Sequence, residues 1–258
     1  MNAQHLAFRL IVDGYVVVPD VIAGADMEDF SDAFESHAGK IGTRHMDFVG
    51  LAGSPRMLAR LCPPKMMDVV DAFYAHYSQT TAFACCSGIR DIFDPAKYDA
   101  SQPWPDYSDL STASVGWHDD VQGVKEPSFR AMSTSLSSLI YLDETFADNG
   151  AYVTAVGTHH LANPGEGDRP ILSPSSLVRE HAELRHLPVK PGSAIIHRAH
   201  NWHGVVSARQ RRRVMIHTFI ARELYFEQPG HTVIEEEHLE HIPAERHKYI
   251  VRTEPAAH

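Results

Sequence analysis

The chain has 258 residues, of which 43% are hydrophobic, and its formal net charge is −10. This length suits one large domain, residues 1–258, because barrels and sandwiches of roughly 200–250 residues commonly form a single unit with one sizeable core. The acidic balance argues against nucleic acid or an anionic membrane as a partner.

The beginning of the chain and its cysteines indicate the compartment. The first ten residues, MNAQHLAFRL, contain no basic segment followed by an apolar run, so no secretory signal is predicted. No stretch approaches the roughly 18 apolar residues that a membrane helix needs. The three cysteines, Cys62, Cys85 and Cys86, make a poor disulfide framework and lack the C-x-x-C spacing of a thiolate zinc site. We therefore expect a cytoplasmic protein.

The N-terminal third is predicted to be mostly helical. A turn at Asp13-Gly14 precedes a short β-rich strand at Tyr15–Val18. Farther along, Met27, Phe30 and Phe34 recur at helical spacing between acidic residues, which predicts an amphipathic helix.

Two more helices are predicted before residue 80. Ser54-Pro55 places a capping residue before a proline at the first helical position, which predicts a short helix through Leu61. A longer helix is predicted from about Pro64 to Tyr77. Its apolar stripe is typical of core packing rather than of cofactor contact, and it consists of Met66, Val70, Phe73 and Tyr77.

After Thr80, turn residues and β-branched runs replace the helical periodicity. Residues 91–113 are rich in Pro, Asp, Tyr and Ser and predict a long loop, either a binding loop or an insertion without function. The polar tail from about Glu223 predicts a peripheral hairpin or helix. Strands are predicted at 133–142, 152–156, 194–197 and 214–221, and residues 187–192 are predicted to form a strand and turn. Helices followed by many short strands indicate an α+β, mainly β fold with a sandwich or barrel core.

His118-x-Asp120 offers one imidazole and one carboxylate as candidate ligands of a metal ion. On an extended strand, residues i and i+2 project to the same side. With a second histidine they would form the two-histidine, one-carboxylate set of non-haem iron oxygenases. A solvated pair on a surface strand is the alternative, because the chain has 18 His and 33 acidic residues. His203 lies at the end of a β-rich run, but composition does not choose among the candidates His159, His160, His197, His200 and His203.

The order of motifs from Phe8 to Ala221 resembles the phytanoyl-CoA dioxygenase family of iron(II)- and 2-oxoglutarate-dependent oxygenases. Each motif is weak alone, but their order and spacing are specific. The similar segments are DGYVVVPDV near the start, Trp117-His118-Asp119-Asp120, Leu142-Asp143-Glu144 through Asn149-Gly150 to Val156-Gly157-Thr158-His159, and Gly192 through His203-Gly204. Val156 stands where the family usually has proline.

The resemblance implies a double-stranded β-helix, a cupin-like jelly roll with the N-terminal helices packed outside. It implies that His118, Asp120 and His203 hold Fe(II), with 2-oxoglutarate and O2 as co-substrates. The other candidate histidines then support the site or lie elsewhere. His159 and His160 are expected to be loop histidines, and His200 is expected to hydrogen-bond near the site if it has a role there.

The family also has an arginine after the distal histidine that binds the far carboxylate of 2-oxoglutarate, a group that suits a planar, permanently charged fork. Matching the strand from Val214 places Arg212 there, whereas counting from His203 favours Arg213. Strand alternation means that the two cannot face the same way. We expect Arg212, with Arg213 as the alternative, and we expect Arg209 and Arg211 to be solvated.

Three positions depart from, or discriminate within, this family pattern. Val205 and Arg198 stand where members often have Ser and His, so the resemblance does not define co-substrate contacts beyond the arginine. Asp120 stands where related iron halogenases have Gly or Ala, which argues for oxygenation over halogenation.

The expected activity is therefore that of an enzyme that hydroxylates an unactivated C–H bond of a small molecule of natural-product type, with release of succinate and CO2. Desaturation, epoxidation, cyclisation or epimerisation at the same metal is the alternative, and a non-catalytic jelly-roll binding module is the third possibility. A CoA thioester is not favoured, and a monomer or homodimer is expected. Candidate substrate-side residues are the 91–113 loop, Ser114, Ser135, Ser137, Leu139 and Tyr141.

Overall fold

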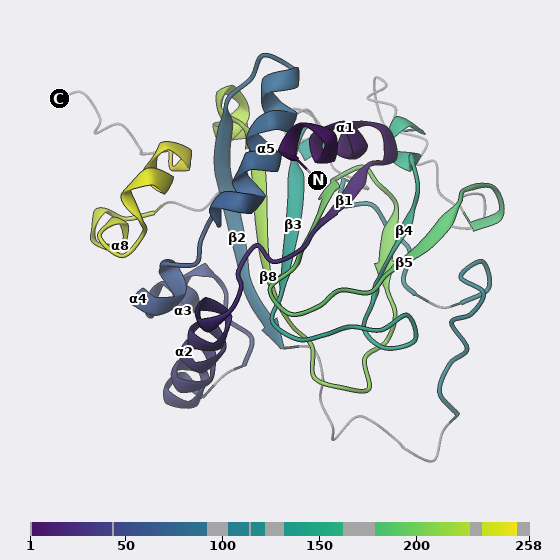
Figure 1. Cartoon of the computed structure of the whole chain (residues 1–258), viewed down its shortest axis with the longest axis horizontal. Coiled ribbons are helices and arrows are strands. Elements are labelled where there is room, and N and C mark those ends of the chain that lie inside the picture. The colour runs from purple at the N-terminus through teal and green to yellow at the C-terminus, as the bar shows by residue number, and fades with distance from the viewer. Residues whose placement is uncertain are drawn as a thin grey trace.

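Two antiparallel sheets form the centre of the protein (Figure 1). The computed structural model describes residues 2–42, 44–91, 103–113, 115–121, 132–161, 179–227 and 234–251. The five-stranded sheet contains, in spatial order, β1 (Tyr15–Val18), β6 (Ala194–Arg198), β3 (Leu136–Tyr141), β8 (Arg213–Ala221) and β2 (Thr81–Asp91). The three-stranded sheet contains β5 (Leu184–Leu187), β4 (Tyr152–Ala155) and β7 (His203–Val205).

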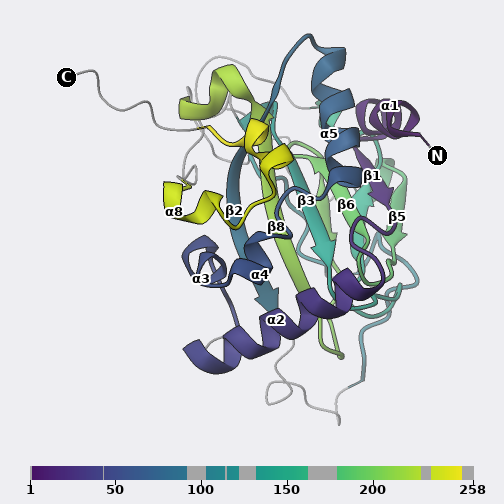
Figure 2. The same cartoon turned by 60° about the vertical axis from the view of Figure 1, so that its left-hand side comes forward.

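Helices cover the outer face of the larger sheet (Figure 2). The apolar stripes of these helices and the outward side chains of the strands, such as Ile140 and Phe219, form one continuous core. The helices are α1 (Ala3–Asp13), α2 (Ala25–Ile41), α3 (Phe48–Ala52), α4 (Pro55–Leu58), α5 (Pro64–His76) and the C-terminal α8 (Glu236–Leu239), with 3-10 turns at η3 (Arg222–Glu227) and η4 (Ala244–Tyr249). The expected mixed α and β composition, with antiparallel strands and N-terminal helices outside them, is confirmed.

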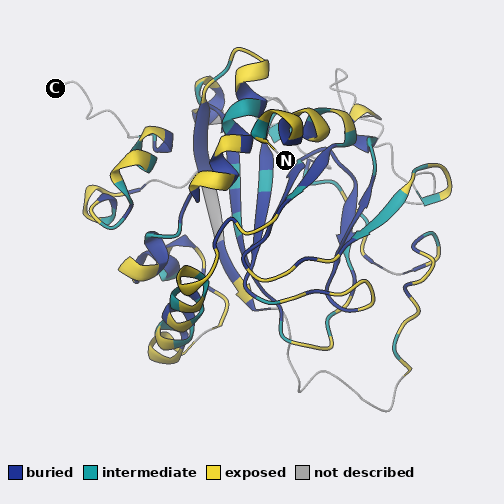
Figure 3. Ribbon diagram, viewed as in Figure 1, coloured by how far each residue is buried: buried dark blue, intermediate teal, exposed yellow. Residues whose placement is uncertain are grey.

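Side chains alternate between the two faces of β8 from Val214 to Phe219. Met215 and Phe219 join the core beneath the helices, whereas Val214 packs with the residues between the two sheets. The strands are mostly buried, and exposed residues are concentrated on helices and loops (Figure 3). Because β3 pairs with β8 and β6 on its two sides, its inward residues lie at the middle of the larger sheet.

The sequence analysis missed α1. Asn2 caps this helix by accepting a hydrogen bond from the His5 amide, and Gly14 ends it at a φ of 83°. Its buried residues, Leu6, Ala7 and Leu10, have helical spacing. That pattern starts before Phe8, where the resemblance to the family begins.

Several predicted boundaries and one predicted core residue were wrong. The short helix after Ser54 ends at Leu58 rather than Leu61. Tyr77 lies just beyond α5 and is 42% exposed, so it does not belong to the apolar stripe. The strand expected to start at Leu187 instead ends there, because Pro188 has no N–H to continue the ladder.

The predicted loop at 91–113 is only partly within the described residues, which resume at position 103. From there to residue 113 the chain is irregular, and Tyr107 and Leu110 pack against Val153 of β4. Residues 103–113 therefore lie against the smaller sheet. Ser114 falls outside the described residues. None of the helices in the described ranges combines the length and apolarity needed to cross a bilayer.

Candidate metal centre and co-substrate pocket

His118, Asp120 and His203 lie together although the two histidines are 85 positions apart in the sequence. One ligand atom from each lies within 4.8 Å of the other two. An isolated antiparallel bridge joins the histidines, with both N–H···O distances at 2.9 Å. Gly204 permits this approach, since a Cβ there would lie 2.5 Å from the Val115 carbonyl oxygen. The smaller sheet thus brings the early H-x-D segment to the distal histidine.

Backbone carbonyls orient both imidazoles. His118 Nδ1 lies 2.7 Å from the Gly116 oxygen, and His203 Nδ1 lies 2.8 Å from the Asn201 oxygen. A carbonyl only accepts, so each Nδ1 carries the proton and each Nε2 keeps a lone pair. Two such nitrogens and one carboxylate are a donor set that suits a divalent non-haem iron.

The environment sets the protonation state that a metal requires. Burial, followed by the neighbouring His197, lowers the pKa of His203 to about 3. Burial opposes ionisation of Asp120, but the nearby imidazoles of His203, His197 and His118 outweigh it and lower the pKa of this carboxyl. Neutral imidazoles and an ionised carboxylate are the forms that bind metal.

A cavity of about 400 Å³ opens beside these three residues, between the two sheets. Of the expected substrate-side residues, Ser135, Ser137 and Leu139 line it, whereas Tyr141 is 0% exposed and packs with Leu139 between the two sheets. The full lining is Arg90, His118, Asp120, Met132, Ser135, Ser137, Leu139, Tyr152, His197, His203, Val205, Arg212, Val214, Ile216 and Thr218. Side chains alternate along a strand, so a cavity-facing Arg212 implies that residues 214, 216 and 218 face the same cavity. The sequence pattern was therefore sufficient to predict this part of the lining.

The other candidate histidines differ in where they lie. His197 lines the cavity, with its Nε2 4.0 Å from an Asp120 oxygen, and Ser137 donates to the same oxygen at 3.3 Å. His159 lies in η2 (Thr158–Leu161), where its Nε2 is 2.8 Å from the Ile11 oxygen and ties this turn to α1. His200 is buried outside the cavity lining.

Arg212 points into the cavity. It is 3% exposed, and its Nε finds no hydrogen-bond partner among the described residues. The guanidinium carbon lies 5.5 Å from the centre of the Tyr141 ring. Gly150 makes room for the stem, since a Cβ there would lie 3.1 Å from Arg212 Cδ. A buried guanidinium that forms no ion pair with a described residue has the chemistry that suits an anionic ligand.

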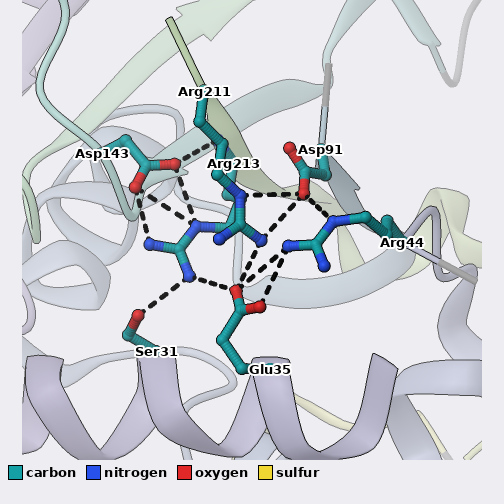
Figure 4. A network of polar contacts seen from close by, with 7 residues as sticks. All are labelled: Ser31, Glu35, Arg44, Asp91, Asp143, Arg211 and Arg213. Carbon is teal, nitrogen blue, oxygen red and sulfur yellow. Dashed lines mark hydrogen bonds and ion pairs between the residues drawn. The ribbon is translucent and has the colours of Figure 1, made fainter. Parts of the chain in front are cut away.

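Arg213 points the opposite way, into a network of ion pairs between β8 and α2 (Figure 4). Its guanidinium binds Asp143 at 2.6 Å and Glu35 at 2.8 Å, and it donates to Ser31 at 2.9 Å. Arg211 joins the same network through Glu35 and Asp91, so the expectation that Arg211 is a solvated loop residue was wrong. Arg44 completes the set of three arginines and three carboxylates.

The comparisons with known proteins agree with this geometry. The model of the family described as phytanoyl-CoA dioxygenase (PhyH) matches residues 11–212. The match therefore includes His118, Asp120 and His203 and ends at Arg212. No curated protein is similar enough in sequence to match the chain.

Solved structures share the fold at low sequence identity. The non-haem α-ketoglutarate-dependent epimerase SnoN from nogalamycin biosynthesis is similar with a TM-score of 0.62 and 17% identity, over 85% of this chain and 80% of its own. The carbocyclase SnoK from the same biosynthesis has a TM-score of 0.59 and 15% identity over 86% of each chain. The nickel complex of the non-haem monooxygenase ThoJ has a TM-score of 0.56 and 15% identity, over 84% of this chain and 77% of its own.

Proposed function

The chain belongs to the phytanoyl-CoA dioxygenase family of non-haem, 2-oxoglutarate-dependent enzymes, and we propose that it hydroxylates an unactivated C–H bond of a small molecule, with release of succinate and CO2. One observation carries the proposal. Two imidazole nitrogens with free lone pairs and one carboxylate converge beside a cavity that is also lined by Arg212, which forms no ion pair with a carboxylate of the described residues. We further infer that the two facing antiparallel sheets form a cupin-like jelly roll.

His118, Asp120 and His203 are proposed as the ligands of Fe(II). When bound, this metal supplies the activation of O2 that is coupled to oxidative decarboxylation of 2-oxoglutarate. The protein positions the ligands: the carbonyls of Gly116 and Asn201 hold the imidazoles in the required tautomer.

Arg212 is proposed to bind the distal carboxylate of 2-oxoglutarate. It is buried, it lines the same cavity as the three ligands, and it forms no ion pair with a described residue. Arg213 is a poor candidate, because Asp143 and Glu35 already neutralise its charge on the other side of the strand.

The neighbouring folds and the cavity volume bear on the reaction outcome and on the size of the substrate. The neighbouring folds include an epimerase and a carbocyclase as well as a monooxygenase, so epimerisation or cyclisation is the main alternative to hydroxylation. The cavity volume of about 400 Å³ suits a small molecule. A cytoplasmic location and a monomeric or homodimeric state remain predictions.

The test is 2-oxoglutarate turnover by the metal-loaded protein. The protein is loaded anaerobically with Fe(II) and 2-oxoglutarate, exposed to O2, and assayed for succinate. We expect succinate from the wild type and none from Asp120→Ala or His118→Ala, which should also retain less iron. His181→Ala, at an exposed histidine, is the matched control. Wild-type protein that binds Fe(II) but forms no succinate, with any member of a natural-product panel, would support the binding-module alternative.

A further inference from the structure

Two buried tyrosines between the sheets have hydroxyl groups that donate to no acceptor in the fold as described. Tyr141 is 0% exposed and Tyr152 is 1% exposed, and neither hydroxyl donates a hydrogen bond to an atom within the part of the chain that the structure describes. Nearly all buried polar groups in proteins are hydrogen-bonded, so two adjacent exceptions need a reason.

The fold can satisfy a buried phenol when the tyrosine is only structural. Tyr74 is as fully buried as these two, yet its hydroxyl lies 2.9 Å from the Phe219 carbonyl oxygen and 3.1 Å from that of Thr134. The unpartnered hydroxyls are instead found on the inner faces of the two sheets, where Tyr141 and Tyr152 belong to one packed cluster with Val214.

One of these tyrosines lies beside a proposed metal ligand and the other beside Arg212. The Tyr152 ring stacks on the His203 ring, with centroids 5.2 Å apart and planes within 10°. The Tyr141 ring faces the Arg212 guanidinium. An ordinary phenol has a pKa of about 10, so both hydroxyls are protonated at neutral pH. Each therefore has an O–H to donate.

We propose that the hydroxyls of Tyr141 and Tyr152 donate hydrogen bonds to 2-oxoglutarate and complete, with Arg212, its binding pocket. This inference rests on the proposed function. A carboxylate has about four lone-pair sites, and one guanidinium fork fills only two of them. Val205 lines the pocket with an apolar side chain and cannot supply the missing donors. If the Tyr141 oxygen accepts from Arg212, its proton remains available to the ligand.

The test measures 2-oxoglutarate binding by calorimetry on the Fe(II)-loaded protein without O2. Tyr141→Phe and Tyr152→Phe are each expected to weaken the affinity about 10-fold, and the double variant about 100-fold, because each removes one hydrogen bond to a charged group. Tyr74→Phe is the matched control and should leave the affinity unchanged.

Thermal unfolding without ligand separates binding from folding. Replacing an unpartnered hydroxyl should not lower Tm, whereas Tyr74→Phe should lower it, because two contacts are lost. Affinities within twofold of the wild type, or a lowered Tm for Tyr141→Phe and Tyr152→Phe, would overturn the inference.

A second ligand locates the hydrogen bonds. 2-Oxopentanoate lacks the distal carboxylate, so a loss confined to 2-oxoglutarate assigns the phenols to that carboxylate, and a loss for both ligands assigns them to the 2-oxo acid end. Either result supports the inference. Wild-type protein that binds neither compound would instead refute the proposed function itself.

Discussion

Two consecutive arginines at the start of β8 lie on opposite faces of the sheet and differ in whether a carboxylate neutralises them. Arg213, at the start of the strand, faces α2 and is neutralised by Asp143 and Glu35. Arg212, one residue earlier, faces the cavity and forms no ion pair with a described residue. An arginine whose charge is balanced within the fold holds elements together, whereas a buried arginine left unbalanced is available for a ligand.

The contrast continues along the strand. On the outer face Met215, His217 and Phe219 are fully buried in close packing, whereas on the inner face Ile216 and Thr218 line an open cavity. Substitutions at the outward-facing odd positions are therefore expected to change stability, and substitutions at the cavity-facing even positions are expected to change ligand binding.

The largest expected effect is on co-substrate binding. Arg212→Leu should weaken 2-oxoglutarate affinity about 100-fold, or about 2.7 kcal/mol, because a charge-assisted fork is lost. The free energy of unfolding should not fall, since the variant removes a buried unpaired cation. Arg213→Leu should change the affinity less than threefold. Calorimetry on both variants measures this, and a larger loss for Arg213→Leu would mean that the assignment is one residue off.

The second effect is on stability and falls on the outer face. Arg213→Leu leaves two carboxylates without this partner, and it should lower the free energy of unfolding by about 1–3 kcal/mol, a value discounted for the partial exposure of Glu35. Urea denaturation gives the value. Arg209→Leu breaks the exposed pair with Asp148 and should cost less than about 0.5 kcal/mol. Equal losses for the two variants would contradict a structural role for the network.

The third effect is a pH dependence from the outer face. Burial lowers the pKa of His217 to about 3, against about 6.5 when unfolded. Below about pH 6.5 the unfolded chain binds a proton there that the folded protein does not bind. The free energy of unfolding should therefore decrease as the pH is lowered below about 6.5, by up to about 1.4 kcal/mol per pH unit from this residue. Urea denaturation of His217→Met at pH 7.5 and 5.0 should show a flatter profile than the wild type, and parallel profiles would refute the assignment.

The smallest expected effect concerns Gly150, which leaves space for the Arg212 side chain. Gly150→Ala places a Cβ 3.1 Å from Arg212 Cδ at a φ of +73°, and it should cost about 1 kcal/mol of stability and several-fold in 2-oxoglutarate affinity. Gly42→Ala has a φ of +69° and no atom within 4 Å of the new Cβ. It should lose similar stability but no affinity. A loss of affinity in Gly42→Ala would show that backbone strain alone is responsible.

The sequence by itself was sufficient to predict several helices and strands and the candidate metal ligands. The spacing of Phe30 and Phe34 predicted α2, and β-branched runs predicted β1 and β8, because side-chain periodicity reports the buried face of each element. The order of motifs was enough to name His118, Asp120 and His203, which the structure brings within 4.8 Å of one another.

Only the tertiary structure decided which charges are balanced. The RQRRR segment offers similar arginines in a row, but their roles differ. Glu35 pairs with both Arg211 and Arg213, Asp91 pairs with Arg211, and Asp143 pairs with Arg213, whereas none of these carboxylates pairs with Arg212. The unpartnered hydroxyls of Tyr141 and Tyr152 were likewise hidden in the sequence. Pairing between residues more than 100 positions apart depends on how the sheets and α2 pack, and no local pattern encodes that packing.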